Sequence, residues 1–166
     1  MELIMTKICY ILVGMPASGK STWIRDNSSI GDLPGNEPYY MASTDDTIET
    51  VSRLYDMTYD QGFKNLIAFA ESVMWNDLRQ AAEEGIKIYI DRTNLTVKSR
   101  KKFIDFLKQY GYTFEAIVFP TPDETEWRRR LDSRQGKTIP DHALESMRNS
   151  YEVPTLSEGF DKITYI

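Results

Sequence analysis

Short apolar runs recur along the chain, separated by longer stretches whose apolar residues recur with a helical period. The runs are nearly continuous rather than alternating, which is typical of strands buried on both faces of a sheet. They predict strands at Ile8–Val13, Tyr39–Ala42, Ile86–Ile90, Phe114–Phe119 and Ile163–Ile166.

The stretches between these runs carry the signals of helices. The clearest is Gln61–Glu84, where apolar residues from Phe63 to Ala81 recur at three- and four-residue spacings and Gly85 ends the helix. Short strands alternating with amphipathic helices predict an α/β fold, with a parallel sheet covered on both faces. The other predicted segments are helices from Lys20, over Ile48–Leu54, over Val97–Tyr110, over Asp123–Leu131 and from Pro140–Asp141 onward, and a loop at 28–38.

Composition narrows the class of protein. The chain has 166 residues, of which 41% are hydrophobic and 27% charged, and its formal charge is −5. These values are typical of one globular domain and argue against a protein that coats nucleic acid through bulk positive charge. No apolar run is long enough to span a membrane, Met1–Thr6 lacks the features of a signal peptide, and Cys9 has no partner for an internal disulfide. We therefore expect a single domain over residues 1–166, located in the cytoplasm, with no membrane association.

A glycine-rich segment lies between the first predicted strand and the first predicted helix. Its sequence, GMPASGKS at residues 14–21, matches the phosphate-binding loop pattern GxxxxGK[ST]. The glycines of such a loop let successive N–H groups face a phosphate at the positive end of a helix. The lysine reaches the terminal phosphates, and the serine hydroxyl ligates Mg²⁺. The segment predicts binding of ATP with Mg²⁺; the alternative is a strand–helix turn with an incidental lysine and serine.

Polar residues follow the second and third predicted strands, at the sheet edge where open α/β sheets bind ligands. A kinase that acts on a hydroxyl needs a carboxylate to take its proton. We expect Asp45 to act as this base, while Asp46 caps the following helix. Asp91 is a candidate for holding Mg²⁺ through water, and Arg92 and Thr93 are candidates for binding the acceptor. Helix capping alone is the alternative for both groups: the Asp pair would cap the helix after the second strand, and Asn94 or Thr93 would start the helix from residue 97 onward.

Arginines are concentrated near the end of one predicted helix. Arg128, Arg129 and Arg130 point about 100° apart on a helix, so at most one or two of them can face one site. Arg130 and Arg134 are four residues apart and share a face, which makes them the better pair. They suit a mobile lid at about 127–139 that closes over the triphosphate and neutralises charge on the transferred phosphoryl group. We expect the other two arginines to face solvent.

The order of these motifs resembles that of the kinase domain of polynucleotide 5′-hydroxyl kinases, which heal DNA and RNA ends. The resemblance implies a three-layer α/β/α P-loop kinase fold, with a mostly parallel sheet of about five strands and a helical lid. It also implies transfer of the γ-phosphate of ATP to the 5′-OH end of DNA or RNA. The matching pieces are GMPASGKSTW (14–23), DD (45–46), DRTNLTVKSRKKF (91–103), RLDSRQGKTIP (130–140) and YEVPTLSEGF (151–160), and they cover nearly the whole chain.

The resemblance also implies roles for individual residues. Lys20, Asp45 and Arg134 are implied to be catalytic, with Asp45 as the general base and Arg134 on the transferring phosphate. Ser21 is implied to hold Mg²⁺, and Arg92 and Thr93 to lie on the acceptor side. The residues implied to bind ATP are Gly14, Ala17, Ser18, Gly19, Lys20, Ser21, Thr22, Arg130 and Arg134.

Two features depart from the family pattern. Some members carry an arginine three positions after the catalytic aspartate, where it grips the 3′-phosphate of the acceptor; here that position is Ile48. Arg53 and the basic group at 98–102 are candidate substitutes, and a different acceptor is the alternative. The chain also lacks the DxDxT-like motif of the phosphatase module that some members carry. The resemblance therefore implies a stand-alone kinase, or one whose partner activities lie on other chains.

Three functions are compatible with these residues. The first is a polynucleotide kinase, in which exposed aromatic rings would stack on the bases of the acceptor. A kinase of a nucleoside, sugar or antibiotic uses the same loop, base and lid, and Ile48 favours it. An ATPase switch without a phosphate acceptor predicts indifference to the loss of Asp45. The candidate stacking rings are Tyr39, Tyr40, Tyr55, Tyr59, Phe63 and Trp75.

Overall fold

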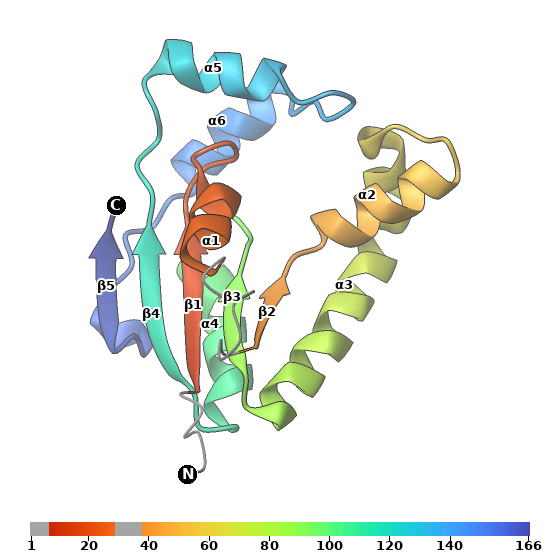
Figure 1. Ribbon diagram of the computed structural model, residues 1–166. Coiled ribbons are helices and arrows are strands. Elements are labelled where there is room, and N and C mark those ends of the chain that lie inside the picture. Colours follow the sequence, from red (N-terminus) through yellow and green to blue (C-terminus); the bar gives the residue numbers. More distant parts are fainter. Residues whose placement is uncertain (1–6, 29–37) are drawn as a thin grey trace.

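The computed structural model describes residues 7–28 and 38–166 (Figure 1). Its centre is a five-stranded sheet in the order β2-β3-β1-β4-β5. The paired strands are all parallel, so their carboxyl ends meet at one edge of the sheet. The strands are β1 (Ile8–Val13), β2 (Tyr39–Ala42), β3 (Lys87–Ile90), β4 (Thr113–Val118) and β5 (Lys162–Tyr165).

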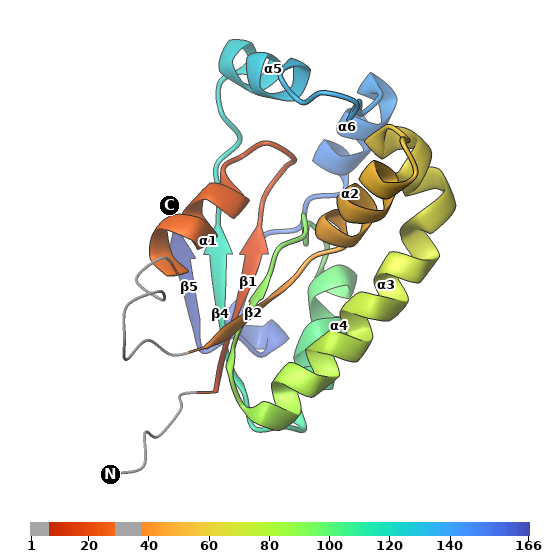
Figure 2. The same ribbon diagram turned by 45° about the vertical axis from the view of Figure 1, so that its right-hand side comes forward.

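Helices cover both faces of the sheet (Figure 2). On one face, Ile24 of α1 joins Leu12 of β1 in a hydrophobic cluster. On the other face, Met74 of α3 and Phe103 of α4 join Cys9 of β1, because successive side chains of a strand point to opposite faces. The helices are α1 (Lys20–Ser28), α2 (Asp45–Leu54), α3 (Tyr59–Glu84), α4 (Val97–Lys108), α5 (Glu124–Asp132), α6 (Asp141–Asn149) and a 3₁₀ helix at Leu156–Glu158.

The helices α5 and α6 lie beyond the carboxyl edge of the sheet (Figure 1). A separate hydrophobic cluster holds them there, because Trp127 of α5 and Leu144 of α6 pack with Met15 of the glycine-rich loop. Trp127 is fully buried, and its indole N–H donates to the carbonyl of Pro16 at 2.7 Å. This packing fixes α5, and the arginines it carries, against the loop.

The helices α2 and α3 are in close contact beside the same edge. A Cβ at Gly62 would lie 1.8 Å from Ser52 Oγ, so only glycine allows this approach. Thr58 and Gln61 form a capping box, which starts α3 at Tyr59. The first turn of α3 is therefore fixed next to α2.

Most of the elements predicted from the sequence are confirmed. β1 and β2 have the predicted bounds, and the other strands are shifted or shortened by one residue. α3 begins two residues earlier than predicted because of its capping box, and the 3₁₀ helix was not predicted. The predicted loop at 28–38 and the segment Met1–Thr6 lie outside the described residues, apart from Ser28 and Pro38. Cys9 is fully buried, and burial raises the pKa of its thiol.

Arg100 differs from the other members of the basic group at 98–102, because Lys98, Lys101 and Lys102 are exposed. It is fully buried, and its Nε and Nη2 each lie 2.8 Å from a carboxylate oxygen of Glu158. Its Nη1 also donates to the carbonyl of Asn94 at 3.0 Å. Removing either partner of such a buried pair leaves an uncompensated charge, so Arg100 ties α4 to the 3₁₀ helix.

Across residues 7–28 and 38–166, no helix has the length and hydropathy needed to cross a membrane.

Candidate active site

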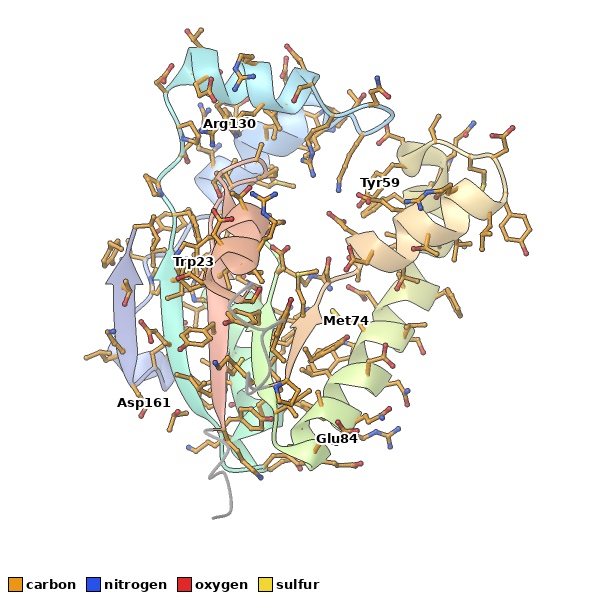
Figure 3. The ribbon with its side chains drawn as sticks, in the orientation of Figure 1. Trp23, Tyr59, Met74, Glu84, Arg130 and Asp161 are labelled. Atoms are coloured by element: carbon orange, nitrogen blue, oxygen red, sulfur yellow. The ribbon has the colours of Figure 1, made fainter. Side chains whose placement is uncertain are left out.

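A cavity of about 1060 Å³ opens at the carboxyl edge of the sheet. Its walls come from the glycine-rich loop, from α1, from the segments after β2 and β3, from the first turns of α3, and from α5, α6 and the segment between them. Figure 3 shows Arg130 on α5 and Tyr59 on α3, on opposite sides of this region. The predicted site residues that line the cavity are Ala17, Ser18, Gly19, Lys20, Ser21, Thr22, Asp45, Asp91, Arg92, Thr93, Arg130 and Arg134; Gly14 does not line it.

The backbone of the glycine-rich loop is held in a tight turn. Gly14 has no room for a side chain, because a Cβ there would lie 2.7 Å from Ser18 Oγ and 3.0 Å from Phe119 Cβ. Gly19 has a φ of +101°, in the region that glycine adopts most easily, and Ala17 has a φ of +59° although it carries a Cβ. A non-glycine residue in this region stores strain, which is typical of functional loops.

Lys20 is enclosed by this turn. It is 8% exposed, and its Nζ donates to the carbonyls of Gly14 at 2.9 Å and Met15 at 2.7 Å. Burial lowers the pKa of Lys20 to about 8, against the opposing charge of Asp91. Within the described part of the chain, the buried Ser18 Oγ has no hydrogen-bond partner. An enclosed cation and an unpaired hydroxyl at a helix N-terminus fit the phosphates of a nucleotide.

Ser21 and Asp91 meet beside the loop. Ser21 Oγ donates to Asp91 Oδ2 at 2.8 Å. Burial, together with the charges of Asp45 and Asp46, raises the pKa of the Asp91 carboxyl and outweighs the hydrogen bond from Ser21. A hydroxyl and a carboxylate side by side fit Mg²⁺, which binds few protein oxygens together with phosphate oxygens and water.

Asp45 faces the cavity from the first position of α2. Its Oδ1 accepts a hydrogen bond from the Tyr59 hydroxyl at 2.5 Å, and its Oδ2 accepts one from Lys137 Nζ at 2.5 Å. Burial raises the pKa of the Asp45 carboxyl, but the hydrogen bonds from Lys137 and Tyr59 outweigh burial and hold it below its ordinary value. Asp45 is therefore an ionised carboxylate at neutral pH.

The expected cap of α2 is wrong. Thr44, not Asp46, holds the N-cap position, and the Thr44 side chain forms no capping hydrogen bond. The backbone N–H of Asp45 instead donates to Ser43 Oγ at 3.2 Å. Asp46 does not line the cavity, so the two aspartates differ in their surroundings although they are adjacent in the sequence.

Arg92 and Thr93 follow β3 in the cavity wall. Arg92 Nη1 lies 3.0 Å from Glu71 Oε1 on α3, so its guanidinium is held by an ion pair. The carbonyl of Thr93 accepts the N–H of Gly14 at 3.0 Å, which ties this segment to the glycine-rich loop. The alternative that Thr93 or Asn94 caps α4 is wrong, because Thr96 is the N-cap.

The arginines of α5 and of the segment after it differ in their surroundings. Because α5 ends at Asp132, Arg134 lies beyond the helix, and the helical face that it was predicted to share with Arg130 does not form. Arg130 lines the cavity, where its Nε lies 2.6 Å from Glu126 and its Nη1 lies 3.4 Å from the carbonyl of Ala17. Arg134 lines it too, and its guanidinium has no hydrogen-bond or ion-pair partner among the described residues. Arg128 and Arg129 form ion pairs outside the cavity.

A second cavity of about 640 Å³ adjoins the first and shares Tyr59, Arg134 and Lys137 with it. Arg53, one candidate substitute for the missing family arginine, lines this second cavity. Ile48 is fully buried. The residues of the other candidate, the basic group at 98–102, line neither cavity.

The candidate stacking rings separate into two groups. Tyr59 and Phe63 line the main cavity. Tyr39, Tyr40, Tyr55 and Trp75 do not. Trp75 is a packing residue, because its ring stacks on that of Phe103 with centroids 5.0 Å apart.

Sequence reasoning missed the two donors that hold Asp45. Lys137 lies in the predicted lid at about 127–139, and Tyr59 is one of the candidate stacking rings, but no local spacing connects either residue to Asp45. Lys137 is 92 positions away in the sequence, so the contact depends on the three-dimensional fold. The signal that sequence analysis could have used is the closeness of Lys137 to Arg134 in one glycine-containing segment.

Comparison with known families identifies the chain. The AAA domain family matches residues 10–154. The chain belongs to this family. Two curated relatives of this AAA domain are heterogeneous nuclear ribonucleoprotein U-like protein 2 of Mus musculus, with 25% identity over 93% of this chain, and a bifunctional polynucleotide phosphatase/kinase of Schizosaccharomyces pombe, with 23% identity over 92%. The chain spans 21% and 32% of the lengths of these two relatives.

Solved structures share the fold of this AAA domain. A candidate kinase of Chloroflexus aurantiacus superposes with a TM-score of 0.70 at 18% identity, over 99% of this chain and 86% of that one. Shikimate kinase of Aquifex aeolicus superposes with a TM-score of 0.53 at 17% identity, over 95% of this chain and 86% of that one. The predicted fold class is confirmed: the chain has the parallel five-stranded sheet of P-loop kinases, flanked by helices.

Proposed function

We propose that the protein is an ATP-dependent polynucleotide 5′-hydroxyl kinase, which transfers the γ-phosphate of ATP to the 5′-OH end of DNA or RNA. The observation that carries the proposal is the pairing in one cavity of an ionised carboxylate, Asp45, with the phosphate-binding lysine, Lys20. The relative named as a polynucleotide phosphatase/kinase supports the choice of acceptor. The reaction needs no further cofactor than Mg²⁺.

Asp45 is the general base of the proposed reaction. Its carboxylate takes the proton of the acceptor hydroxyl as that oxygen forms a bond to the γ-phosphorus. The bond between the γ-phosphorus and the bridging oxygen breaks, and ADP leaves. The low pKa of Asp45 keeps it ionised at neutral pH, ready to orient the hydroxyl and accept the proton.

Cationic side chains from two walls stabilise the charge on the phosphates. Lys20 binds the phosphates from the glycine-rich loop, and the backbone N–H groups of the loop complete the phosphate-binding site. Arg130 and Arg134 approach from the segment 127–139, which acts as the lid of this kinase domain. Because the Arg134 guanidinium has no ion-pair partner within residues 7–28 and 38–166, it meets the transferring phosphoryl group without losing a contact to this part of the chain.

Ser21 and Asp91 are the residues that would hold Mg²⁺, Asp91 through water. The ion would neutralise charge on the β- and γ-phosphates. Arg92 and Thr93 lie in the same wall and contribute to the acceptor side of the cavity.

A kinase of a small molecule is the second candidate, and one observation favours it. Ile48 is fully buried where some polynucleotide kinases carry an acceptor-binding arginine. Such a kinase would use Lys20, Asp45 and Arg134 in the same roles. An ATPase switch would instead hydrolyse ATP at a rate that no acceptor changes.

Transfer of labelled phosphate from ATP to a panel of acceptors tests the proposal. The panel contains 5′-OH DNA, 5′-OH RNA, the same oligonucleotides with 5′-phosphate ends, and free nucleosides. We expect transfer to 5′-OH ends alone. Transfer to nucleosides with none to oligonucleotides would support the small-molecule kinase, and ATP hydrolysis that is independent of every acceptor would support the switch.

A further inference from the structure

Two aromatic side chains from successive turns of α3 form a pair in the cavity wall. The ring centroids of Tyr59 and Phe63 are 6.0 Å apart, with 33° between the ring planes. The hydroxyl and the ring of Tyr59 already have protein partners, because the hydroxyl donates to Asp45 and Lys137 Nζ lies 3.9 Å from the ring centroid. Phe63 therefore extends the aromatic surface that begins at the proposed base.

Phe63 differs from the other large rings of the cavity in its exposure. It is 45% exposed, although it lines a cavity. Trp23 and Phe119 also line the cavity, but their rings pack together at 6.1 Å within the hydrophobic cluster under α1. The Phe63 ring thus keeps much of its apolar surface free of protein contacts, and a ligand that covered this surface would gain from its burial.

The aromatic pair has a fixed position relative to the lid. The Asp60 carboxylate accepts the backbone N–H of Thr138 on both oxygens, at 3.1 and 3.0 Å. The N–H of Asp60 donates to the carbonyl of Gly136 at 3.1 Å. These bonds join the first turn of α3 to the segment that carries Arg134, so Phe63 and the lid cations surround one space.

We propose that Phe63 is a stacking surface for the nucleobase of the acceptor's 5′-terminal nucleotide. The proposal rests on the proposed function, since it assumes an acceptor whose 5′ hydroxyl meets Asp45. The base on C1′ and the 5′ hydroxyl group on C4′ leave the same face of the sugar from different ring carbons, so the two groups are separated. Phe63 and Asp45 are likewise separated, and each contacts Tyr59. Every base has a π face, so this surface would accept all four bases and would serve an enzyme that heals ends of any sequence.

The test uses two oligonucleotides with 5′-OH ends, one with 2-aminopurine as its terminal base and one with an abasic terminal nucleotide. Phe63→Leu keeps an apolar side chain but removes the π face. Phe69→Leu is the matched control, because Phe69 is on the same helix, is 55% exposed and lines neither cavity. The readouts are the KM for transfer to each oligonucleotide and the quenching of 2-aminopurine fluorescence on binding, which does not require transfer.

We expect Phe63→Leu to raise the KM for the 2-aminopurine end roughly tenfold, the effect of losing one base–ring stack, and to abolish most of the quenching. The KM for the abasic end and all values for Phe69→Leu should stay at wild-type levels. Equal KM changes for both ends, or quenching that persists in Phe63→Leu, would overturn the stacking role. If the wild-type protein transfers phosphate to neither oligonucleotide, the proposed function fails, and the quenching measurement still decides whether Phe63 binds a base.

Discussion

Lys137 Nζ lies 2.5 Å from Asp45 Oδ2 and joins two walls of the cavity that come from distant parts of the chain. Asp45 begins α2, and Lys137 lies between α5 and α6. Tyr59 occupies the other carboxylate oxygen. Because both oxygens accept hydrogen bonds, an acceptor hydroxyl has to displace one donor or share its oxygen. Lys137 is the donor from the segment between α5 and α6, so in the proposed kinase acceptor binding and the position of this segment would be coupled through this contact.

Replacing Lys137 should change the pH dependence of transfer. The hydrogen bond from Lys137 lowers the pKa of Asp45, so its loss in Lys137→Met raises that pKa. The base acts only when ionised, and the acid limb of the kcat/KM profile should therefore move to higher pH. Lys137→Arg, which keeps the charge, should move it less. An acid limb at the wild-type position in Lys137→Met would show that this contact does not set the pKa of the base.

Lys20 should take up protons when ATP binds at alkaline pH. Its pKa is about 8 without nucleotide, so a large fraction is neutral at about pH 8.5. Phosphate charges favour the protonated lysine, and affinity should therefore fall as pH rises through this range. Calorimetry in two buffers with different ionisation enthalpies measures the uptake, and Lys20→Met should abolish it. Binding heats that do not depend on the buffer would contradict the assignment.

The loss of Arg134 should affect turnover more than nucleotide binding. Its guanidinium lines the cavity without an ion-pair partner among the described residues, which suits a contact made in the transition state. We expect Arg134→Ala to lower kcat roughly 10²-fold and to change the Kd for ATP little. Arg129→Ala is the control, because Arg129 pairs with Glu126 outside the cavity. An effect confined to the Kd for ATP would make Arg134 an ordinary binding residue.

Local sequence signals predicted the parts of the site that depend on one strand–turn–helix unit. The glycine-rich loop is an example, because Gly14, Gly19 and Lys20 have their roles within a single turn. The strands were equally predictable from the sequence, because a continuous apolar run such as Ile8–Val13 is buried wherever it lies in a parallel sheet.

Contacts between segments that are distant in the sequence could not be predicted from local patterns. The spacing of Arg130 and Arg134 predicted a shared face, but it carried no information on the pairing of Lys137 with Asp45. Arg100 was equally misleading, because a run of basic residues suggests a solvated face, whereas the partner that buries it, Glu158, is 58 positions away. The cap of α2 was missed because an Asp pair at a helix start fits both capping and catalysis.

The proposed reaction depends most on Asp45 as the base, and single-turnover transfer by Asp45→Asn to a 5′-OH oligonucleotide is the sharpest test of this role. Asp46→Asn is the matched control, since Asp46 is adjacent but does not line the cavity. We predict that Asp45→Asn binds ATP with wild-type Kd but transfers phosphate at least about 10²-fold more slowly, while Asp46→Asn remains close to wild type. Transfer by Asp45→Asn at the rate of Asp46→Asn would contradict the account.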